Sequence, residues 1–174
     1  MRWTRTTLLA LALGGASMAA QAQDVKVDWD HQADFNGFKT YAWQPGTPAR
    51  NPLWDQRITQ AVDEQLEAKG LQKVSPNANP DLIVIYHAAV GHETQFNTTN
   101  MGGWGYWGTG MSTTTVNKIP TGELIVDIGN AKTKTVIWMG TATDTLSDNP
   151  EKNRKKVENA VNKMFKKFPP NEGK

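Results

Sequence analysis

The stretch Asp81-Leu82-Ile83-Val84-Ile85-Tyr86-His87-Ala88-Ala89-Val90 decides the fold of this chain. Successive side chains of a β-strand point to opposite faces, and the first half of this stretch is apolar on both faces. Such a strand lies in the middle of a sheet, with helices against one of its faces. Pro80 precedes the strand, and we expect the strand to end at Gly91.

Two helices are expected to cover the sheet. Asn51 is a typical N-cap, Pro52 takes the first helical position and Gly70 ends the helix. The same Asn-Pro pair at 149–150 begins a second helix. Each helix has a single apolar stripe, so both need one shared surface. The pattern predicts an α+β two-layer sandwich, with a largely antiparallel sheet and two helices packed on one face.

The remaining strands flank the central one. Alternating patterns predict strands at residues 24–30, 40–44, 71–74, 123–128 and 135–143. The last two form a hairpin whose turn uses Gly129 and Asn130, which tolerate positive φ. Threonine-rich segments at 93–99 and 112–117 form a second, longer hairpin with its tip at residues 101–111.

The chain is organised as one domain behind a secretory signal. Residues 1–22 combine Arg2 and Arg5, a short apolar run and the small-x-small sequence Ala20-Gln21-Ala22, which predicts cleavage before Gln23. Residues 23–170 are expected to form a single α+β domain, and residues 171–174 a disordered tail. No segment is apolar for long enough to cross a membrane.

Charge and cysteine usage exclude several functions. Without Arg2 and Arg5, the 19 basic residues fall to 17 and equal the 17 acidic ones, so we expect no nucleic-acid partner. Cysteine is absent, which excludes disulfides, thiolate metal sites, a thiol nucleophile and a lipid anchor on an N-terminal cysteine. We expect a soluble periplasmic or secreted protein without a cofactor.

The order of several motifs resembles a bacterial family. These motifs are Asp34-Phe35-Asn36-Gly37-Phe38-Lys39-Thr40-Tyr41-Ala42-Trp43, Asn51-Pro52, Pro80-Asp81-Leu82 with Tyr86-His87, and Gly122-Glu123-Leu124 with Trp138-Met139-Gly140-Thr141-Ala142. Together they resemble domain-of-unknown-function family 4136 over nearly the whole mature chain. The resemblance implies a protein of the Gram-negative cell envelope, where many members are lipoproteins, and it implies no catalytic residues. This sequence departs from the family pattern because it has no cysteine to be lipidated.

His87, His92 and Glu93 are the candidate site for an alternative function, a metal-dependent or hydrolytic enzyme at the end of the central strand. Both imidazole rings could converge there and bind Zn²⁺ or Cu²⁺ with Glu93 or His31. The spacing matches no established metal motif, and a lone strand histidine usually satisfies a hydrogen bond. Asp127 is expected to face solvent or to pair with a lysine. No serine lies in a Gly-x-Ser-x-Gly elbow, so no catalytic residue is assigned.

The outer face of the second helix is rich in lysine. Its members include Lys152, Lys155, Lys156, Lys163, Lys166 and Lys167. Such a face makes weak contact with an anionic surface such as lipid head groups, or it is simply solvated.

The segment Trp104-Gly105-Tyr106-Trp107-Gly108, within the tip bounded by Met101 and Met111, is the candidate partner-binding site. Its glycines keep the rings out of regular structure, so the rings either pack over the open sheet face or bind a partner. Exposed tryptophan and tyrosine favour sugar rings and protein hot spots. We therefore predict a non-catalytic binding or accessory module of the envelope, whose partner is an envelope protein or a glycan.

Overall fold

The computed structural model describes residues 23–101 and 111–170, and the side chains of residues 23–97 and 114–170. The predicted signal peptide (1–22), the predicted tail (171–174) and the aromatic residues within 102–110 lie outside the described residues. The elements, in chain order, are β1 (Asp24–Trp29), β2 (Thr40–Trp43), α1 (Pro52–Ala68), β3 (Gln72–Lys73), β4 (Leu82–Met101), β5 (Met111–Asn130), β6 (Thr135–Thr145) and α2 (Pro150–Phe165). Within the described ranges, neither helix is long and apolar enough to cross a membrane.

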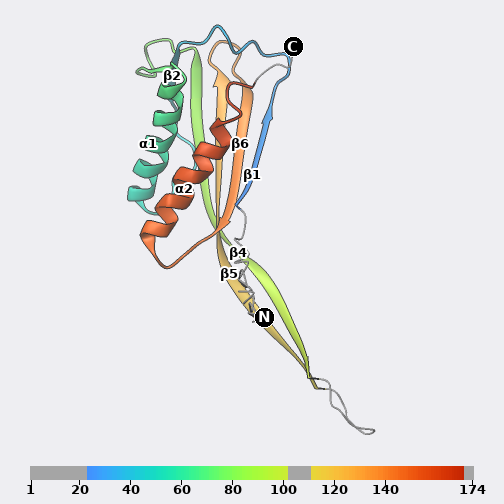
Figure 1. Ribbon diagram of the computed structural model, residues 1–174. Helices are drawn as coiled ribbons and strands as arrows, with labels where there is room; N and C mark the ends of the chain where they lie inside the picture. Colours follow the sequence, from blue (N-terminus) through green and yellow to red (C-terminus); the bar gives the residue numbers. More distant parts are fainter. Residues whose placement is uncertain (1–22, 102–110, 171–174) are drawn as a thin grey trace, which may run out of the picture.

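The strands form one sheet, and both helices cover the same face of it (Figure 1). The strand order is β1-β6-β5-β4-β2-β3. Strands β1, β6, β5 and β4 pair antiparallel, whereas β2 pairs parallel with both β4 and β3. The predicted α+β two-layer sandwich with a largely antiparallel sheet is therefore confirmed.

Strand β4 lies inside the sheet, between β5 and β2. Leu82, Val84 and Tyr86 are buried in the core. The alternate residues Ile83 and Ile85 are half-buried, since they point to the face opposite the helices. Strand β2 runs parallel to β4 because α1 lies between them in the chain and carries it back across the sheet.

We expected the central strand to end at Gly91, and this expectation is wrong. Strand β4 continues to Met101, and β5 runs unbroken from Met111 to Asn130. Gly91 pairs with Thr121 within the ladder, and its φ is not positive. The glycine therefore extends the strand instead of turning the chain, and the two predicted threonine-rich strands are the outer halves of β4 and β5.

The turn between β5 and β6 also differs from the expected one. Positive φ occurs at Lys134 (61°), while Gly129 and Asn130 remain part of β5. The side-chain oxygen of Asn130 accepts hydrogen bonds from the backbone N–H groups of Lys132 (2.9 Å) and Thr133 (3.3 Å). Asparagine thus shapes this turn by hydrogen bonding to the backbone and not by adopting a left-handed conformation.

Both helices begin at the predicted caps. Asn51 Oδ1 accepts the Leu53 N–H at 3.0 Å, and Asn149 Oδ1 accepts the Glu151 N–H at 2.9 Å. These bonds satisfy backbone donors that the first helical turn leaves without a partner. Gly70 follows α1 with φ +83°, as expected for a residue after a helix end. The buried helix residues are Ile58, Ala61, Val62 and Leu66 in α1 and Ala160, Val161, Met164 and Phe165 in α2.

Trp138 of β6 lies at the centre of the core. Its side chain is 0% exposed, and its ring centroid lies 5.1 Å from that of Phe165 and 5.4 Å from that of Phe168. A Cβ atom on Gly140 would come within 2.7 Å of the Trp138 ring and 3.0 Å of the Met164 sulfur. Glycine at position 140 therefore leaves the space that the tryptophan ring and the α2 side chain fill.

Asp63 of α1 ties the helix to the strands at the edge of the sheet. Its Oδ1 accepts hydrogen bonds from the Tyr41 hydroxyl at 2.7 Å and from Trp43 Nε1–H at 2.8 Å. Its Oδ2 lies 2.8 Å from Lys73 Nζ. Burial, together with the hydrogen bond to Asp63, raises the pKa of Tyr41. The hydroxyl is therefore a permanent donor to the carboxylate at neutral pH.

Asp81 anchors the start of β2, and replacing it with asparagine tests this role. Its Oδ2 accepts the N–H groups of Lys39 (2.9 Å) and Thr40 (3.0 Å) and the Thr40 hydroxyl (3.0 Å). These hydrogen bonds, first that of the Lys39 N–H, lower the pKa of Asp81. The carboxylate therefore stabilises the fold above its unfolded pKa of about 3.9, and this contribution is lost as the pH falls through the folded pKa.

We expect Asp81→Asn to lower the free energy of unfolding by about 1 kcal/mol at neutral pH, because the site is half-exposed. The difference from the wild type should disappear at acid pH, where the aspartate is itself neutral. Urea unfolding of the wild type and of Asp81→Asn, from neutral to acid pH, measures this difference in the free energy of unfolding. An equal loss at every pH would show that the charge of Asp81 contributes nothing.

Candidate functional site

The outer halves of β4 and β5 form a two-stranded arm that leaves the body of the protein (Figure 1). We define the arm as residues 91–101 and 111–121, which pair from Gly91 with Thr121 to Met101 with Met111. Strand β6 stops at Thr145, the partner of Thr121. Within the described part of the chain, the two arm strands beyond this point form ladder pairs only with each other.

The arm exposes large apolar side chains. Phe96 is 69% exposed and faces Val116, which is 52% exposed, across the two strands. Val90, at the base of the arm, is 47% exposed. Two-stranded ribbons are marginally stable in water by themselves, and exposed apolar side chains that gather on one surface mark interaction sites.

The aromatic residues Trp104, Tyr106 and Trp107 lie outside the described residues. The backbone of Met101 ends β4 and that of Met111 begins β5, so the predicted limits of the hairpin tip agree with the ends of the strands.

The structure places the two histidines of the candidate metal site apart. Strand β4 pairs with β5 residue by residue from Leu82 to Met101, so its side chains alternate between faces. His87 and Glu93 therefore belong to one face and His92 to the other. Among the described residues, no group of three His, Cys, Asp or Glu side chains is placed to hold a metal ion.

His87 instead contacts a loop residue and a neighbouring strand. Its Nδ1 accepts the Thr47 N–H at 3.1 Å and lies 2.8 Å from Thr47 Oγ1. Its Nε2 lies 3.8 Å from Asp127 Oδ2. Asp127 thus lies beside a histidine, with its side chain 20% exposed, whereas we expected it to face solvent or to pair with a lysine. Burial raises the pKa of Asp127, and the charge of His87 opposes this shift.

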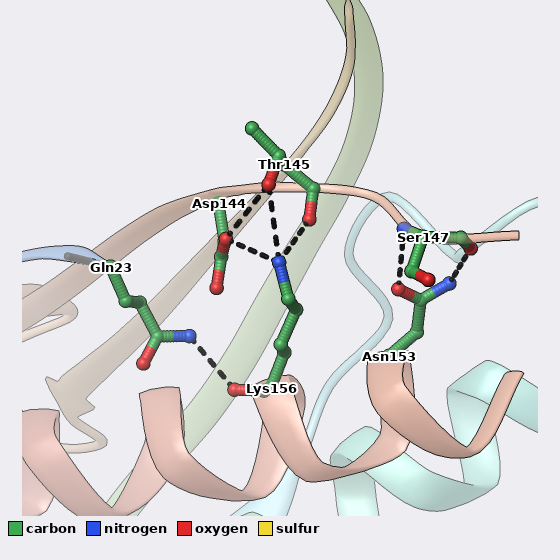
Figure 2. Close-up of polar contacts among 6 residues, drawn as sticks. All are labelled: Gln23, Asp144, Thr145, Ser147, Asn153 and Lys156. Carbon is green, nitrogen blue, oxygen red and sulfur yellow. Dashed lines mark hydrogen bonds and ion pairs between the residues drawn. The ribbon is translucent and has the colours of Figure 1, made fainter. Parts of the chain in front are cut away.

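Lys156 does not belong to the lysine-rich outer face of α2, contrary to the prediction. It lies one turn before the buried Ala160 and so on the sheet side of the helix. Its Nζ donates to Asp144 Oδ1 (2.7 Å) and to the Thr145 carbonyl (2.7 Å), as Figure 2 shows. Its backbone carbonyl accepts Gln23 Nε2–H at 2.8 Å. The exposed lysines that remain are Lys152, Lys155, Lys163, Lys166 and Lys167.

A cavity of about 560 Å³ lies between the two helices and the sheet, at the end from which the arm leaves. Small residues from three neighbouring strands, Ala88, Gly122 and Ala142, line its floor, and Trp54 of α1 and Val157 of α2 line its sides. At the other end of the sheet, the same face carries larger side chains that fill the space under the helices. The change from large to small residues along the strands leaves this volume open.

Four charged residues line the cavity, namely Arg50, Glu123, Asp144 and Lys156. Asp144 and Lys156 neutralise each other. Glu123 alternates with the buried Leu124, so its side chain points to the opposite face of the sheet. The guanidinium of Arg50 has no hydrogen bond or ion pair with any described residue. Arg50 is therefore the one cationic group of this lining that is available to an anion.

Comparison with protein families gives a match to "Domain of unknown function (DUF4136)" over residues 25–170. The chain belongs to the DUF4136 family. The match covers every described strand and helix except the first residue of β1, and it confirms the resemblance seen in the motifs. A comparison with curated proteins gives no match.

Solved structures share the DUF4136 fold at low sequence identity. A DUF4136 family protein from Bacteroides thetaiotaomicron has 18% identity and a TM-score of 0.55, over 84% of this chain and 96% of that one. The PelC dodecamer from Paraburkholderia phytofirmans has 15% identity and a TM-score of 0.51, over 83% and 96%. A PDZ domain protein from Parabacteroides distasonis has 18% identity and a TM-score of 0.59, over 87% of this chain but only 37% of that longer one.

The cavity of this DUF4136 chain is the feature that sequence reasoning missed. Its floor residues Ala88, Gly122 and Ala142 lie on three strands. Gly122 and Ala142 belong to motifs that carry the family resemblance, but those motifs did not indicate a cavity. The available signal is the sequence of β4, in which the helix-facing residues decrease in size from Tyr86 to Ala88. That change predicts lower packing density under the helices only once the positions of the neighbouring strands are known.

Proposed function

We propose that this DUF4136 protein is a non-catalytic binding or accessory module of the bacterial envelope, and that the arm with its aromatic loop carries the partner surface. The main support is the arm itself, which holds Phe96 and Val116 exposed on a ribbon roughly 35 Å long. Assignment to the envelope rests on the signal-like sequence of residues 1–22 and on the resemblance to envelope proteins of this family.

The edges of the arm suit a protein partner that adds a strand. Natural proteins protect free strand edges with charges or proline. In the arm sequence, the charged residues are Glu93 and Lys118, and the proline is Pro120 at the base. Most other arm residues are threonine, asparagine and other uncharged residues, so an extended segment can add to the outer edge of the β4 part of the arm through main-chain hydrogen bonds. The aromatic loop would then add affinity through its rings.

A second copy of the same chain is one candidate for this partner. The similar fold of PelC occurs as a dodecamer, although at 15% identity the likeness concerns the fold alone. Mass photometry of the purified protein separates self-assembly from binding of another envelope protein or a glycan. In either case we expect the arm to provide the contact.

We expect simultaneous replacement of Trp104, Tyr106 and Trp107 by serine to abolish partner binding with almost no change in thermal stability. Exposed rings contribute within about 0.5 kcal/mol each to folding. If the rings instead pack over the sheet, each truncation should lower the free energy of unfolding by about 3–5 kcal/mol. Thermal unfolding of the triple variant, together with pull-down of cross-linked partners from envelope extracts, measures both quantities.

Val136→Ser is the matched control, because Val136 is 59% exposed and lies near the start of β6, at the end of the sheet opposite the arm. This variant should keep the partner that the triple variant loses. A large fall in the midpoint of the triple variant would show that the rings belong to the core. Unchanged capture by the triple variant would equally contradict a binding role for the loop.

A further inference from the structure

We propose that the cavity beneath α1 and α2 binds one unbranched alkyl chain with an anionic head group, the chain within the cavity and the head group at Arg50. The site is separate from the arm surface proposed above. Its volume of about 560 Å³ falls within the range of roughly 300–1,000 Å³ that is usual for small-molecule sites.

The lining selects an apolar ligand. Besides the floor residues, the apolar lining includes Trp54, Ile58, Leu124, Leu146, Val157 and Ala160. Apart from Arg50, the principal polar groups beside them already have partners within the protein. Lys156 donates to Asp144 and to the Thr145 carbonyl, while Asn153 both donates to and accepts from the backbone of Ser147 (Figure 2). A polar ligand would lose its hydrogen bonds to water on entering the cavity and would find few protein groups to replace them.

The cavity is held open by the fold and does not arise from a loose side chain. Gly122 has no side chain, and a Cβ atom there would come within 2.9 Å of Leu146 Cδ2. The backbone of Leu146 is held by its N–H, which donates to the Pro120 carbonyl at 2.7 Å. Lys156 and Asn153 tie the end of β6 and the following loop to α2 on the same side. A preformed site of this kind loses little conformational entropy on binding.

Arg50 sets the charge of the head group. It is exposed, lines the cavity and has no polar partner among residues 23–97 and 114–170. An arginine binds a carboxylate or phosphate through two parallel hydrogen bonds. Asp55 Oδ1 accepts the Ala49 N–H at 2.7 Å and the Tyr86 hydroxyl, and among the described residues no ion pair joins Asp55 to Arg50.

Titration calorimetry with hexadecanoate, below its micelle concentration, tests the site in the mature protein. We expect saturable binding of one molecule per chain. Across octanoate, dodecanoate and hexadecanoate, each added methylene should tighten binding by up to about fourfold until the cavity is full. The same titration with lysophosphatidylglycerol distinguishes the two sources of the ligand. Binding of this lipid indicates that the larger head group fits beside Arg50, whereas binding of hexadecanoate alone indicates a free fatty acid.

Three variants locate the ligand. Ala88→Leu should abolish binding by filling the floor, and Ala142→Leu repeats the test on another strand if the first variant does not fold. Arg50→Gln should weaken hexadecanoate about tenfold or more and leave the neutral hexadecan-1-ol unchanged. Ala68→Leu, at the exposed end of α1, is the matched control and should bind as the wild type does.

A brominated fatty acid gives an independent readout. Bromine quenches nearby indole fluorescence, so the quenching should decrease in Trp54→Phe, whose ring lines the cavity. The proposal is overturned if hexadecanoate shows no saturable binding, if folded Ala88→Leu and Ala142→Leu proteins bind like the wild type, or if Arg50→Gln weakens the acid and the alcohol equally.

Discussion

Replacement of Trp138 by alanine is expected to lower the free energy of unfolding by about 3–5 kcal/mol. The side chain is 0% exposed and lies against Phe165, Phe168 and Gly140. Its removal leaves a cavity that the antiparallel strands on either side cannot close. It also leaves the Lys167 carbonyl without the indole N–H that contacts it at 3.3 Å.

Val136→Ala is the matched control for this prediction, because Val136 lies two residues away on β6 and is 59% exposed. The free energy of unfolding of Val136→Ala should remain within about 0.5 kcal/mol of the wild-type value. Urea unfolding monitored by far-ultraviolet circular dichroism measures both variants. A small loss at Trp138 would show that the aromatic cluster with Phe165 and Phe168 rearranges to fill the space.

The second large effect is expected at Asp63. Alanine at this position removes the acceptor of the Tyr41 hydroxyl and the Trp43 indole N–H and the partner of Lys73. Hydrogen bonds to charged groups contribute about 1.5–3 kcal/mol each, and buried donors without a partner are costly. We expect Asp63→Ala to lower the free energy of unfolding by about 3 kcal/mol.

Asparagine and a neighbouring glutamate provide the controls for Asp63. Asp63→Asn keeps an acceptor oxygen for Tyr41 and Trp43, so we expect about half the loss seen with alanine. Glu64→Ala removes an exposed carboxylate from the next helical position and should have almost no effect. Equal losses for Asp63→Ala and Asp63→Asn would mean that the charge, and not the hydrogen bonds, stabilises the edge of the sheet.

Local signals in the sequence predicted the helices and most strands correctly. Asn51 and Asn149 cap the helices, as their position before proline indicates, and the alternation around Leu82 and Val84 places β4 inside the sheet. These features depend on neighbouring residues alone. They can therefore be predicted from the sequence without information on tertiary contacts.

The errors occur where a distant partner overrides a local preference. Gly91 resembles a strand end, but Thr121 pairs with it and the ladder continues. Lys156 resembles a solvated residue of α2, but Asp144 on β6 draws it toward the sheet. The cavity floor has the same origin, since Ala88, Gly122 and Ala142 come together only through the strand pairing. None of these partners is near its counterpart in the sequence.

The pairing of β1 with β6 has a consequence for the order in which the protein can fold. Trp29 of β1 pairs with Trp138 of β6. The first strand of the sheet therefore cannot pair until most of the chain has been synthesised. A polypeptide that emerges from the ribosome with its N-terminus first cannot complete this sheet during synthesis. The sheet is thus complete only when the chain is almost finished.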